Sequence, residues 1–237
     1  MKISIIGLGR YGELLGKELL KKGYFVSGTT RTEEKKTKLE KAGFKVSTLL
    51  YPQVPQDILC ADIIILNIPP FEKQLDWYKS WPWKKNTWII FISSTSVVPI
   101  PDSENGFLLK EEEDWFRSYF QDTTILRFGG LISETSHPGK YLSGRKSLPG
   151  KLWPVNLIHM NDTVDATCVV LEKKLKNITV NIVTDEHPMR EEFYSNYCQK
   201  HQLPLPQFDQ NDLTKGKIIS NSELKNFFIP KRSIWDC

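Results

Sequence analysis

Apolar residues in the first half of the chain form short runs that alternate with longer, helically spaced segments. The run 63–66 is uninterrupted Ile-Ile-Ile-Leu, which is typical of a strand buried on both faces of a parallel sheet. The leucines between positions 14 and 20 recur at helical spacing and predict one apolar helix face. Gly23 then ends that helix.

The same pattern continues through most of the chain. The expected strands are 3–6, 24–27, 44–47, 63–66, 88–92, 123–128, 156–159 and 178–183. The expected helices are 14–22, 33–42, 71–81, 109–120, 162–175 and 188–202. This alternation predicts an α/β fold with a parallel, doubly wound sheet and right-handed crossovers.

Other segments lack this periodicity. Proline-rich loops are expected at 51–56 and 99–106, and a loop with a short helix over the cleft at 129–150. No regular element is predicted after Pro204. The length of 237 residues suits one domain, 1–237, with a small substrate lobe contributed mainly by 129–160 and 184–237.

A glycine motif lies between the first strand and the first helix. Gly7, Gly9 and Gly12 have the G-x-G-x-x-G spacing, and a strand–turn–helix context is what this motif requires. Gly7 permits the turn, Gly9 lets the backbone approach a pyrophosphate, and Gly12 lets the helix lie close to the strand. The helix N-terminus then offers N–H groups to the phosphates. The motif predicts a Rossmann-type dinucleotide site, and the alternative is a glycine-rich turn without cofactor.

Ligands of such sheets lie at the carboxyl ends of the strands. The expected cofactor-binding residues are therefore Gly7, Leu8, Gly9, Arg10, Tyr11, Gly12, Thr30, Arg31, Asn67, Ile68, Pro69 and Ser93.

The end of the second strand predicts which dinucleotide binds. NAD enzymes place a carboxylate there, whereas this chain has Thr30 and Arg31 and no carboxylate before Glu33. An arginine pairs bidentately with a 2′-phosphate, and Arg10 adds a second charge. We therefore expect NADP rather than NAD, against the alternative that Arg31 is simply a solvated residue at a helix start.

Four segments, in order, resemble the short-chain dehydrogenase/reductase superfamily, in its extended or atypical branch of NAD-dependent epimerases/dehydratases. The segments are GLGRYG at 7–12, ISSTSVV at 92–98, LRFGGL at 126–131 and NLIHMND at 156–162. The resemblance implies a nicotinamide-dependent oxidoreductase or epimerase-like enzyme. It also implies that Ser94, with its neighbour Thr95, is the catalytic Ser/Thr.

One departure from this resemblance concerns the chemistry. The family relies on a Tyr-x-x-x-Lys pair, and none of the eight tyrosines has a lysine four residues later. Tyr141 comes nearest, with Arg145 in the lysine position. A hydroxyl such as that of Ser94 can hydrogen-bond a substrate carbonyl but cannot protonate it alone, and its alternative role is to cap the strand end.

Three residues of the later third are candidate substrate contacts, namely His137, Arg145 and His159. For His159 a packed structural role is the favoured alternative, and for Asp162 the expectation is a helix N-cap. The acidic run at 111–114 is expected to be a solvated helix start.

Composition excludes several classes. The net charge of +4 is too small and scattered for a nucleic-acid-binding protein, and no apolar run is long enough to cross a membrane. The four cysteines form no C-x-x-C pair and the histidines no metal-ligand spacing. We therefore expect a cytoplasmic protein with reduced thiols and no metal. The oligomeric state stays open, with a homodimer among the options.

The sequence thus predicts an NAD(P)-dependent oxidoreductase or epimerase-like protein that acts on a small polar substrate such as a nucleotide sugar. The missing Tyr-x-x-x-Lys pair keeps open a catalytically silent NADP-binding sensor or regulatory protein. A structural partner without any cofactor is the third option.

Overall fold

The computed structural model of the protein describes residues 1–53, 56 and 58–237. It divides into two compact units, one made of Met1–Arg127 and Thr167–Val180, the other of Phe128–Ala166 and Asn181–Cys237. Part of the expected loop 51–56, at positions 54 and 55, lies outside the described residues.

A seven-stranded sheet organises the first unit. Its strands are β1 (Lys2–Ile6), β2 (Phe25–Thr30), β3 (Lys45–Thr48), β4 (Ile63–Leu66), β5 (Trp88–Ser94), β6 (Thr123–Phe128) and β9 (Thr179–Ile182). The order is β3-β2-β1-β4-β5-β6-β9. β1 pairs in parallel with β2 and β4, as do β2 with β3 and β4 with β5. The strand order reverses between β1 and β4, which is where doubly wound sheets bind ligands.

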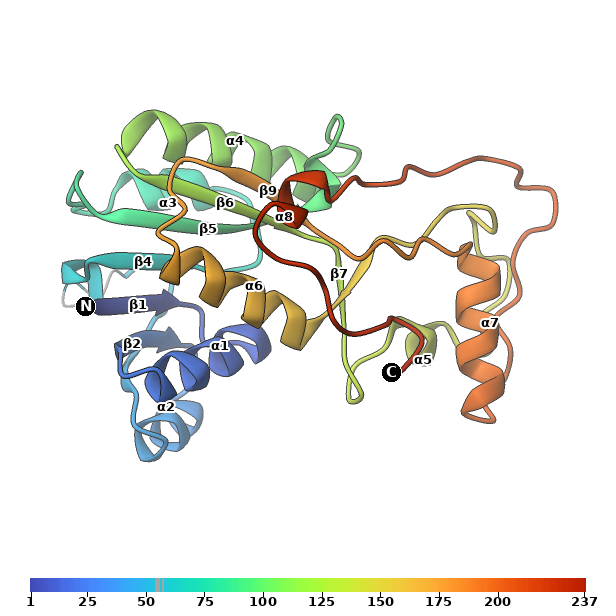
Figure 1. Ribbon diagram of the computed structural model, residues 1–237, viewed down its shortest axis with the longest axis horizontal. Helices are drawn as coiled ribbons and strands as arrows, with labels where there is room; N and C mark the ends of the chain where they lie inside the picture. The colour runs from blue at the N-terminus through green and yellow to red at the C-terminus, as the bar shows by residue number, and fades with distance from the viewer. Residues whose placement is uncertain (54–55, 57) are drawn as a thin grey trace. The chain divides into compact units, whose positions relative to one another are not determined.

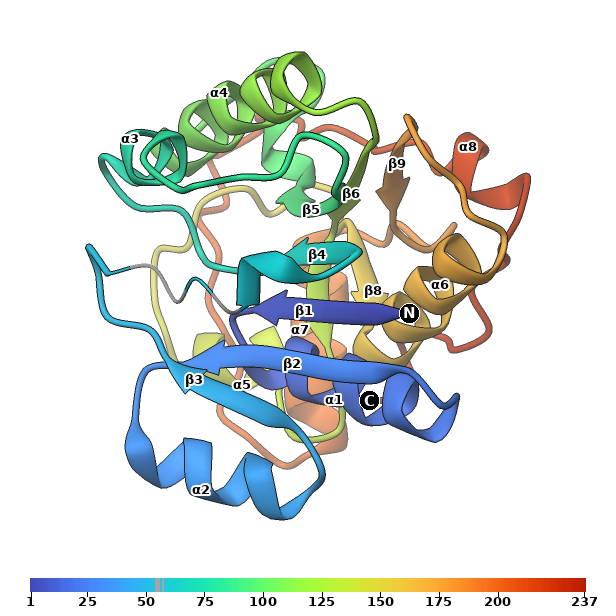
Figure 2. The same ribbon diagram turned by 90° about the vertical axis from the view of Figure 1, so that its left-hand side faces the viewer.

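Helices cover both faces of this sheet. They are α1 (Arg10–Lys21), α2 (Glu33–Lys41), α3 (Gln74–Lys79) and α4 (Glu104–Tyr119), with short 3-10 turns η1 (Ile58–Cys60) and η2 (Thr95–Val97). α1 and α2 lie on one face, and α3 and α4 on the other (Figures 1 and 2). The predicted Rossmann-type α/β fold is confirmed.

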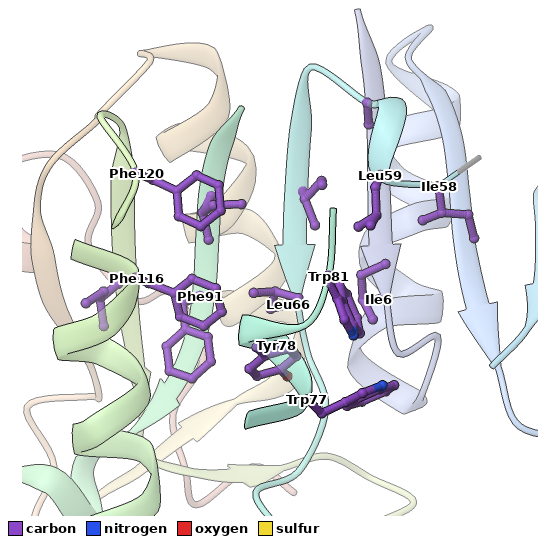
Figure 3. Packing of buried hydrophobic residues seen from close by; sticks show 14 of the residues in the cluster. Ile6, Ile58, Leu59, Leu66, Trp77, Tyr78, Trp81, Phe91, Phe116 and Phe120 are labelled. Atoms are coloured by element: carbon purple, nitrogen blue, oxygen red, sulfur yellow. The ribbon is translucent and has the colours of Figure 1, made fainter. Parts of the chain in front are cut away.

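The core under α3 and α4 is aromatic (Figure 3). Tyr78, Phe91 and Phe116 are fully buried between these helices and β5, and Trp81 stands edge-on to Tyr78 with ring centroids 5.3 Å apart. Edge-to-face ring pairs add to the stabilisation that burial supplies.

The second unit has its own small core, of Ile132, Val155, Leu157, Phe193, Tyr194, Phe208 and Ile234. Its elements are β7 (Gly130–Ile132), α5 (Pro138–Leu142), β8 (Leu157–His159), α7 (Arg190–Lys200) and α8 (Ser222–Lys225), and α6 (Met160–Glu172) begins in it. β7 and β8 pair in parallel as a separate two-stranded sheet. β7 and α8 had no counterpart among the predicted elements.

Two carboxylates hold the last part of the chain within this unit. Asp162 is fully buried and accepts from the backbone N–H groups of Lys231 and Arg232 at 3.1 and 3.0 Å, and from the Arg232 guanidinium. Glu186 accepts from the Ser233 hydroxyl at 2.8 Å and the Ile234 N–H at 2.9 Å. The expected N-cap role of Asp162 is therefore wrong, because α6 begins two residues earlier.

The start of α4 also differs from the prediction. The helix begins at Glu104, because the Ser103 side chain accepts a hydrogen bond from the Gly106 N–H at 3.2 Å and caps it there. The acidic run 111–114 is therefore in the middle of the helix. It is not a solvated start, since Glu112 and Glu113 are buried.

No described helix is long and apolar enough to cross a membrane. None of the four cysteines forms a disulfide bond with another described residue, and Cys168 and Cys198 are buried.

Glu112 is a buried carboxyl that lacks a hydrogen-bond partner for one of its oxygens among the described residues. It is 1% exposed, and its Oε2 has no hydrogen-bond partner among the described residues. Burial first, and the charge of Glu111 second, raise its pKa from 4.5 to about 8. Because the folded state holds this proton more tightly than the unfolded chain, stability falls as pH rises from about 4.5 to about 8.

Replacing Glu112 by Gln removes this pH dependence. We expect Glu112→Gln to gain stability relative to the unmodified protein as pH rises, at up to about 1.4 kcal/mol per pH unit within the window. Thermal unfolding at pH 5, 7 and 9 measures the gain. The control is Glu40→Gln, an exposed glutamate on another helix, α2, and an identical profile for both variants would contradict the assignment.

Candidate functional site

A cavity of about 610 Å³ lies in the first unit, at the carboxyl ends of β1, β2, β3 and β4. Its lining consists of Gly7, Leu8, Gly9, Thr29, Thr30, Arg31, Thr32, Lys35, Leu49, Tyr51, Asn67, Ile68, Pro69, Pro70, Phe71 and Trp77. Parallel pairing brings these strand ends to one edge of the sheet, so the cavity adjoins the point where the strand order reverses.

The three motif glycines differ in whether contacts with the described residues explain why a larger residue would not fit. Gly7 has φ +101°, and a Cβ there would lie 2.3 Å from the Asn67 carbonyl oxygen. A Cβ on Gly12 would lie 2.4 Å from the Gly7 carbonyl oxygen. Gly9 has φ −70°, and a Cβ there would meet nothing within 4 Å among the described residues. Packing and backbone conformation within the chain thus account for Gly7 and Gly12 but not for Gly9.

The turn after β1 is held from two sides. The Gly7 N–H donates to the Thr29 hydroxyl and the Leu8 N–H to the Thr29 carbonyl, at 2.9 and 2.7 Å. The Asn67 amide donates to the Gly7 carbonyl at 2.9 Å. Gly9 is the N-cap of α1, and no side chain among the described residues caps this helix end. Its N–H groups and positive dipole end suit an anion.

Cations line the end of β2. Arg31 is exposed and Lys35 is half-buried, both on the cavity wall with Thr32. Thr32 is the N-cap of α2, since its hydroxyl accepts from the Lys35 N–H at 3.4 Å. The Glu33 carboxylate bonds the Thr48 hydroxyl and lies 3.3 Å from Lys36 Nζ, and Glu33 is not among the described lining residues.

A neighbouring carboxylate touches Lys35. Lys35 Nζ lies 3.5 Å from Glu13 Oε2, and Lys17 Nζ lies 2.8 Å from Glu13 Oε1. The hydrogen bond from Lys17 lowers the pKa of Glu13, with smaller contributions from the charges of Lys17 and Lys35. Glu13 is therefore ionised at neutral pH and fixes the lysine beside the cavity.

Another part of the described lining is aromatic. Tyr51, Phe71 and Trp77 form a cluster with ring centroids 5.5 to 5.8 Å apart. Trp77 lies on α3 among the buried core residues (Figure 3), whereas Tyr51 is 56% exposed.

The end of β5 carries a buried polar cluster. Glu113 on α4 is fully buried and accepts from the Ser93 hydroxyl at 2.7 Å and from Arg127 Nε at 2.8 Å. Ser94 follows, and its hydroxyl oxygen accepts from the Ser96 N–H at 3.1 Å and caps η2. This bond leaves the Ser94 hydroxyl hydrogen available for an acceptor. Thr95 is 8% exposed.

The three candidate substrate residues lie in the second unit. His137 caps α5 through Nδ1, which accepts from the Gly139 N–H at 3.0 Å, and stacks on Tyr197 with centroids 3.7 Å apart. Burial, with the charges of His201 and Lys200, lowers the pKa of His137 to about 4, so the ring is neutral at pH 7. Its substrate role stays a prediction.

His159 and Arg145 are placed differently. His159 is 3% exposed, and its Nδ1 accepts from the Asn161 N–H at 3.1 Å. Its Nε2 lies 3.5 Å from Glu134 Oε1. Arg145 is exposed, so of the three it has the side chain most accessible to a ligand.

The structure brings most expected cofactor residues together. Gly7, Leu8, Gly9, Thr30, Arg31, Asn67, Ile68 and Pro69 line the cavity, whereas Arg10, Tyr11, Gly12 and Ser93 do not. Gly12 supports the turn, and the buried Tyr11 hydroxyl bonds the Thr167 hydroxyl at 2.7 Å. Arg10 is exposed on the first turn of α1.

Sequence reasoning did not single out Lys35, Tyr51, Phe71 or Trp77. Lys35 lies four residues after Arg31 in the sequence, so a second cation near the end of the second strand could have been predicted. The aromatic wall had no such signal, because its three residues come from separate segments.

The chain is similar to proteins of known sequence over nearly its whole length. Residues 2–86 match the family described as NADP oxidoreductase coenzyme F420-dependent. Protein YeeZ of Escherichia coli K12 is 28% identical over 256 residues, which covers 95% of this chain and 93% of that protein.

Solved structures share the fold. UDP-glucose 4-epimerase of Thermotoga maritima, solved with UDP-glucose, has a TM-score of 0.77 at 16% identity. The match covers 100% of this chain and 96% of the epimerase chain. dTDP-glucose 4,6-dehydratase of Bacillus anthracis, solved with NAD, has a TM-score of 0.73 at 15% identity. The match covers 99% of this chain and 93% of the dehydratase chain. The fold is thus that of the NAD-dependent epimerases/dehydratases, and the expected resemblance is confirmed at this level.

The unequal packing of the glycines predicts unequal stabilities. Gly12→Ala places a methyl group against the Gly7 carbonyl, so we expect a loss of about 1–3 kcal/mol. Gly9→Ala enters open space with an ordinary φ, so we expect a loss of only about 0.5 kcal/mol, which comes from alanine being a poorer N-cap than glycine. Urea unfolding of both variants measures this, and equal losses would contradict it.

Proposed function

We propose that this protein binds NADP(H) in the cavity of the first unit. We further propose that it is a nicotinamide-dependent oxidoreductase or epimerase-like enzyme for a small polar substrate, of which a nucleotide sugar is the leading candidate. The single observation behind cofactor binding is Gly9, because no contact with the described residues explains why this position lacks a side chain. A pyrophosphate lying against this backbone explains it.

The residues present fit the diphosphate. The N-terminus of α1 borders the cavity at its N-cap, Gly9. No described side chain caps this end of the helix. Thr29 and Asn67 use their polar groups to fix the Gly7 turn, so the turn is organised before a ligand arrives. Preorganisation of this kind reduces the cost of binding.

The charges at the end of β2 favour NADP over NAD. Arg31 and Lys35 on the cavity wall supply two positive charges for a 2′-phosphate. No carboxylate that could hold the ribose hydroxyls of NAD is among the described lining residues, and Glu33 bonds Thr48 instead.

The bound nicotinamide would supply or accept the hydride. Of this chain's residues, Ser94 at the end of β5 would hydrogen-bond the substrate carbonyl through its hydroxyl hydrogen, with Thr95 beside it. The Glu113 carboxylate holds the preceding Ser93 and so fixes the local strand end. Support for a nucleotide sugar comes from the shared fold with UDP-glucose 4-epimerase.

A catalytically silent NADP-binding sensor is the second candidate. The observation favouring it is that no tyrosine is followed by a lysine four residues on. The Ser94 oxygen also has a structural task in capping η2.

Calorimetry with NADPH tests the cofactor proposal, and turnover of UDP-glucose or dTDP-glucose with bound cofactor separates enzyme from sensor. Binding with turnover supports the enzyme, and binding without turnover of any nucleotide sugar supports the sensor. No heat with NADPH or NADH, and no thermal shift, would reject both.

Gly9→Val tests the cradle itself. We expect the side chain to occupy the space of the pyrophosphate and weaken NADPH binding about tenfold or more, equivalent to about 1.4 kcal/mol. The melting temperature should remain near that of the unmodified protein, because the site is open. Unchanged NADPH affinity in calorimetry would contradict the proposal that the pyrophosphate lies against the Gly9 backbone.

Lys35→Ala and Arg31→Ala test the cofactor preference. Each removes a charge-assisted contact worth about 1.5–3 kcal/mol, so NADPH binding should weaken about tenfold or more while NADH binding changes little. Lys36→Ala is the control, since Lys36 pairs with Glu33 and does not line the cavity. Tighter binding of NADH than NADPH by the unmodified protein would refute the preference.

Ser94→Ala tests the substrate hydroxyl. We expect turnover to fall about tenfold or more, consistent with loss of one hydrogen bond to the reacting carbonyl, while NADPH affinity stays constant. Ser96→Ala is the matched control, because only its backbone N–H enters the cap. Equal turnover in both variants would leave Ser94 a structural cap.

A further inference from the structure

Glu13 connects the first turns of two helices that border the cavity. It lies on α1, one turn after the N-cap, and its N–H donates to the Gly9 carbonyl at 3.0 Å. Its side chain is 16% exposed, and its carboxylate lies 3.5 Å from Nζ of Lys35 on α2. Glu13 is not among the described lining residues, whereas Gly9 and Lys35 are. The carboxylate therefore links the helix start proposed for the pyrophosphate to a cation on the cavity wall.

Lys35 is fixed at both its backbone and its ammonium group. Its N–H donates to the Thr32 hydroxyl at 3.4 Å, which holds the backbone in the first turn of α2. Its Nζ is held by Glu13. Arg31, another cation of the lining, is an exposed residue. A long side chain loses conformational freedom when it closes on a ligand, so a lysine that is ordered beforehand binds an anion at a smaller cost.

The Glu13 carboxylate does not cancel the positive charge of this cluster. Lys17 Nζ lies 2.8 Å from its other oxygen, so two ammonium groups share one carboxylate and a net positive charge remains. The hydrogen bond from Lys17 lowers the pKa of Glu13, and the charges of nearby lysines lower it further. A phosphate group that approaches Lys35 therefore meets a net positive charge, while Glu13 keeps Lys17 as a partner.

We infer that Glu13 is a specificity-determining residue of the cofactor site, which acts by positioning Lys35 for the 2′-phosphate of NADP(H). This inference rests on the proposed cofactor binding. It assigns the preference for NADPH over NADH in part to an acidic residue on α1. The consequence is opposite to that of simple electrostatics, in which removing a negative charge beside an anion site strengthens binding of the more negative ligand.

Glu13→Gln distinguishes the two effects, because it removes the charge and keeps the size of the side chain. Calorimetry should show that NADPH binds about fivefold more weakly, the factor that ordering one long side chain costs. NADH lacks the 2′-phosphate and should bind within about twofold of the unmodified protein. Glu18→Gln is the matched control, since it removes the same charge from the same helix and Glu18 pairs with Lys21 at 3.1 Å. It should leave both affinities within about twofold.

A double variant shows whether Glu13 acts through Lys35. In the Lys35→Ala background, adding Glu13→Gln should leave the ratio of NADPH to NADH affinity unchanged, because the side chain to be positioned is already missing. A further fall of this ratio in the double variant would overturn the inference, since Glu13 would then act on the cofactor by another route. Melting temperatures confirm that each variant is folded.

The outcomes separate this inference from the function on which it rests. Equal or tighter NADPH binding by Glu13→Gln overturns the positioning role, and so does an equal loss for both dinucleotides. In these cases NADP(H) binding itself stands. Tighter binding of NADH than of NADPH by the unmodified chain removes the preference and this inference, and leaves a dinucleotide site. Absence of binding of both dinucleotides to the unmodified chain overturns the proposed function and this inference together.

Discussion

The close approach of two turns, one after β1 and one after β4, is the constraint on which the site depends. The Gly7 backbone and the Asn67 carbonyl are so near that a Cβ on Gly7 would lie 2.3 Å from that oxygen. The Asn67 amide then bonds the Gly7 carbonyl, and Thr29 bonds the other side of the turn. Three neighbouring strands thus determine where α1 begins. The path of the backbone at Gly9 follows from that.

Much of this could be predicted because the information is local. The uninterrupted run at 63–66 and the leucine spacing before Gly23 each determine one element from its own residues. The glycine spacing likewise located one wall of the cavity, because backbone conformation at Gly7 is a property of the turn itself. The Thr32 cap is local in the same sense.

What could not be predicted depends on contacts between distant segments. Nothing near Glu112 and Glu113 in sequence distinguishes them from an exposed acidic run, yet one is a buried carboxyl of raised pKa and the other the partner of Arg127. Asp162 was expected to cap its own helix and instead binds the backbone about seventy positions later. The aromatic wall likewise joins Tyr51 to Trp77 through tertiary packing.

The interleaved course of the chain has a consequence for its synthesis. The first unit is finished only by Thr167–Val180, which supplies the Thr167 hydroxyl for Tyr11 and the first half of the edge strand β9. The second is finished only when residues 231–234 reach Asp162 and Glu186. On a ribosome, therefore, the described residues that line the cavity, Gly7 to Trp77, are all made long before the edge strand that completes their unit. Neither unit can be released as one continuous piece by a protease or exchanged as one by recombination.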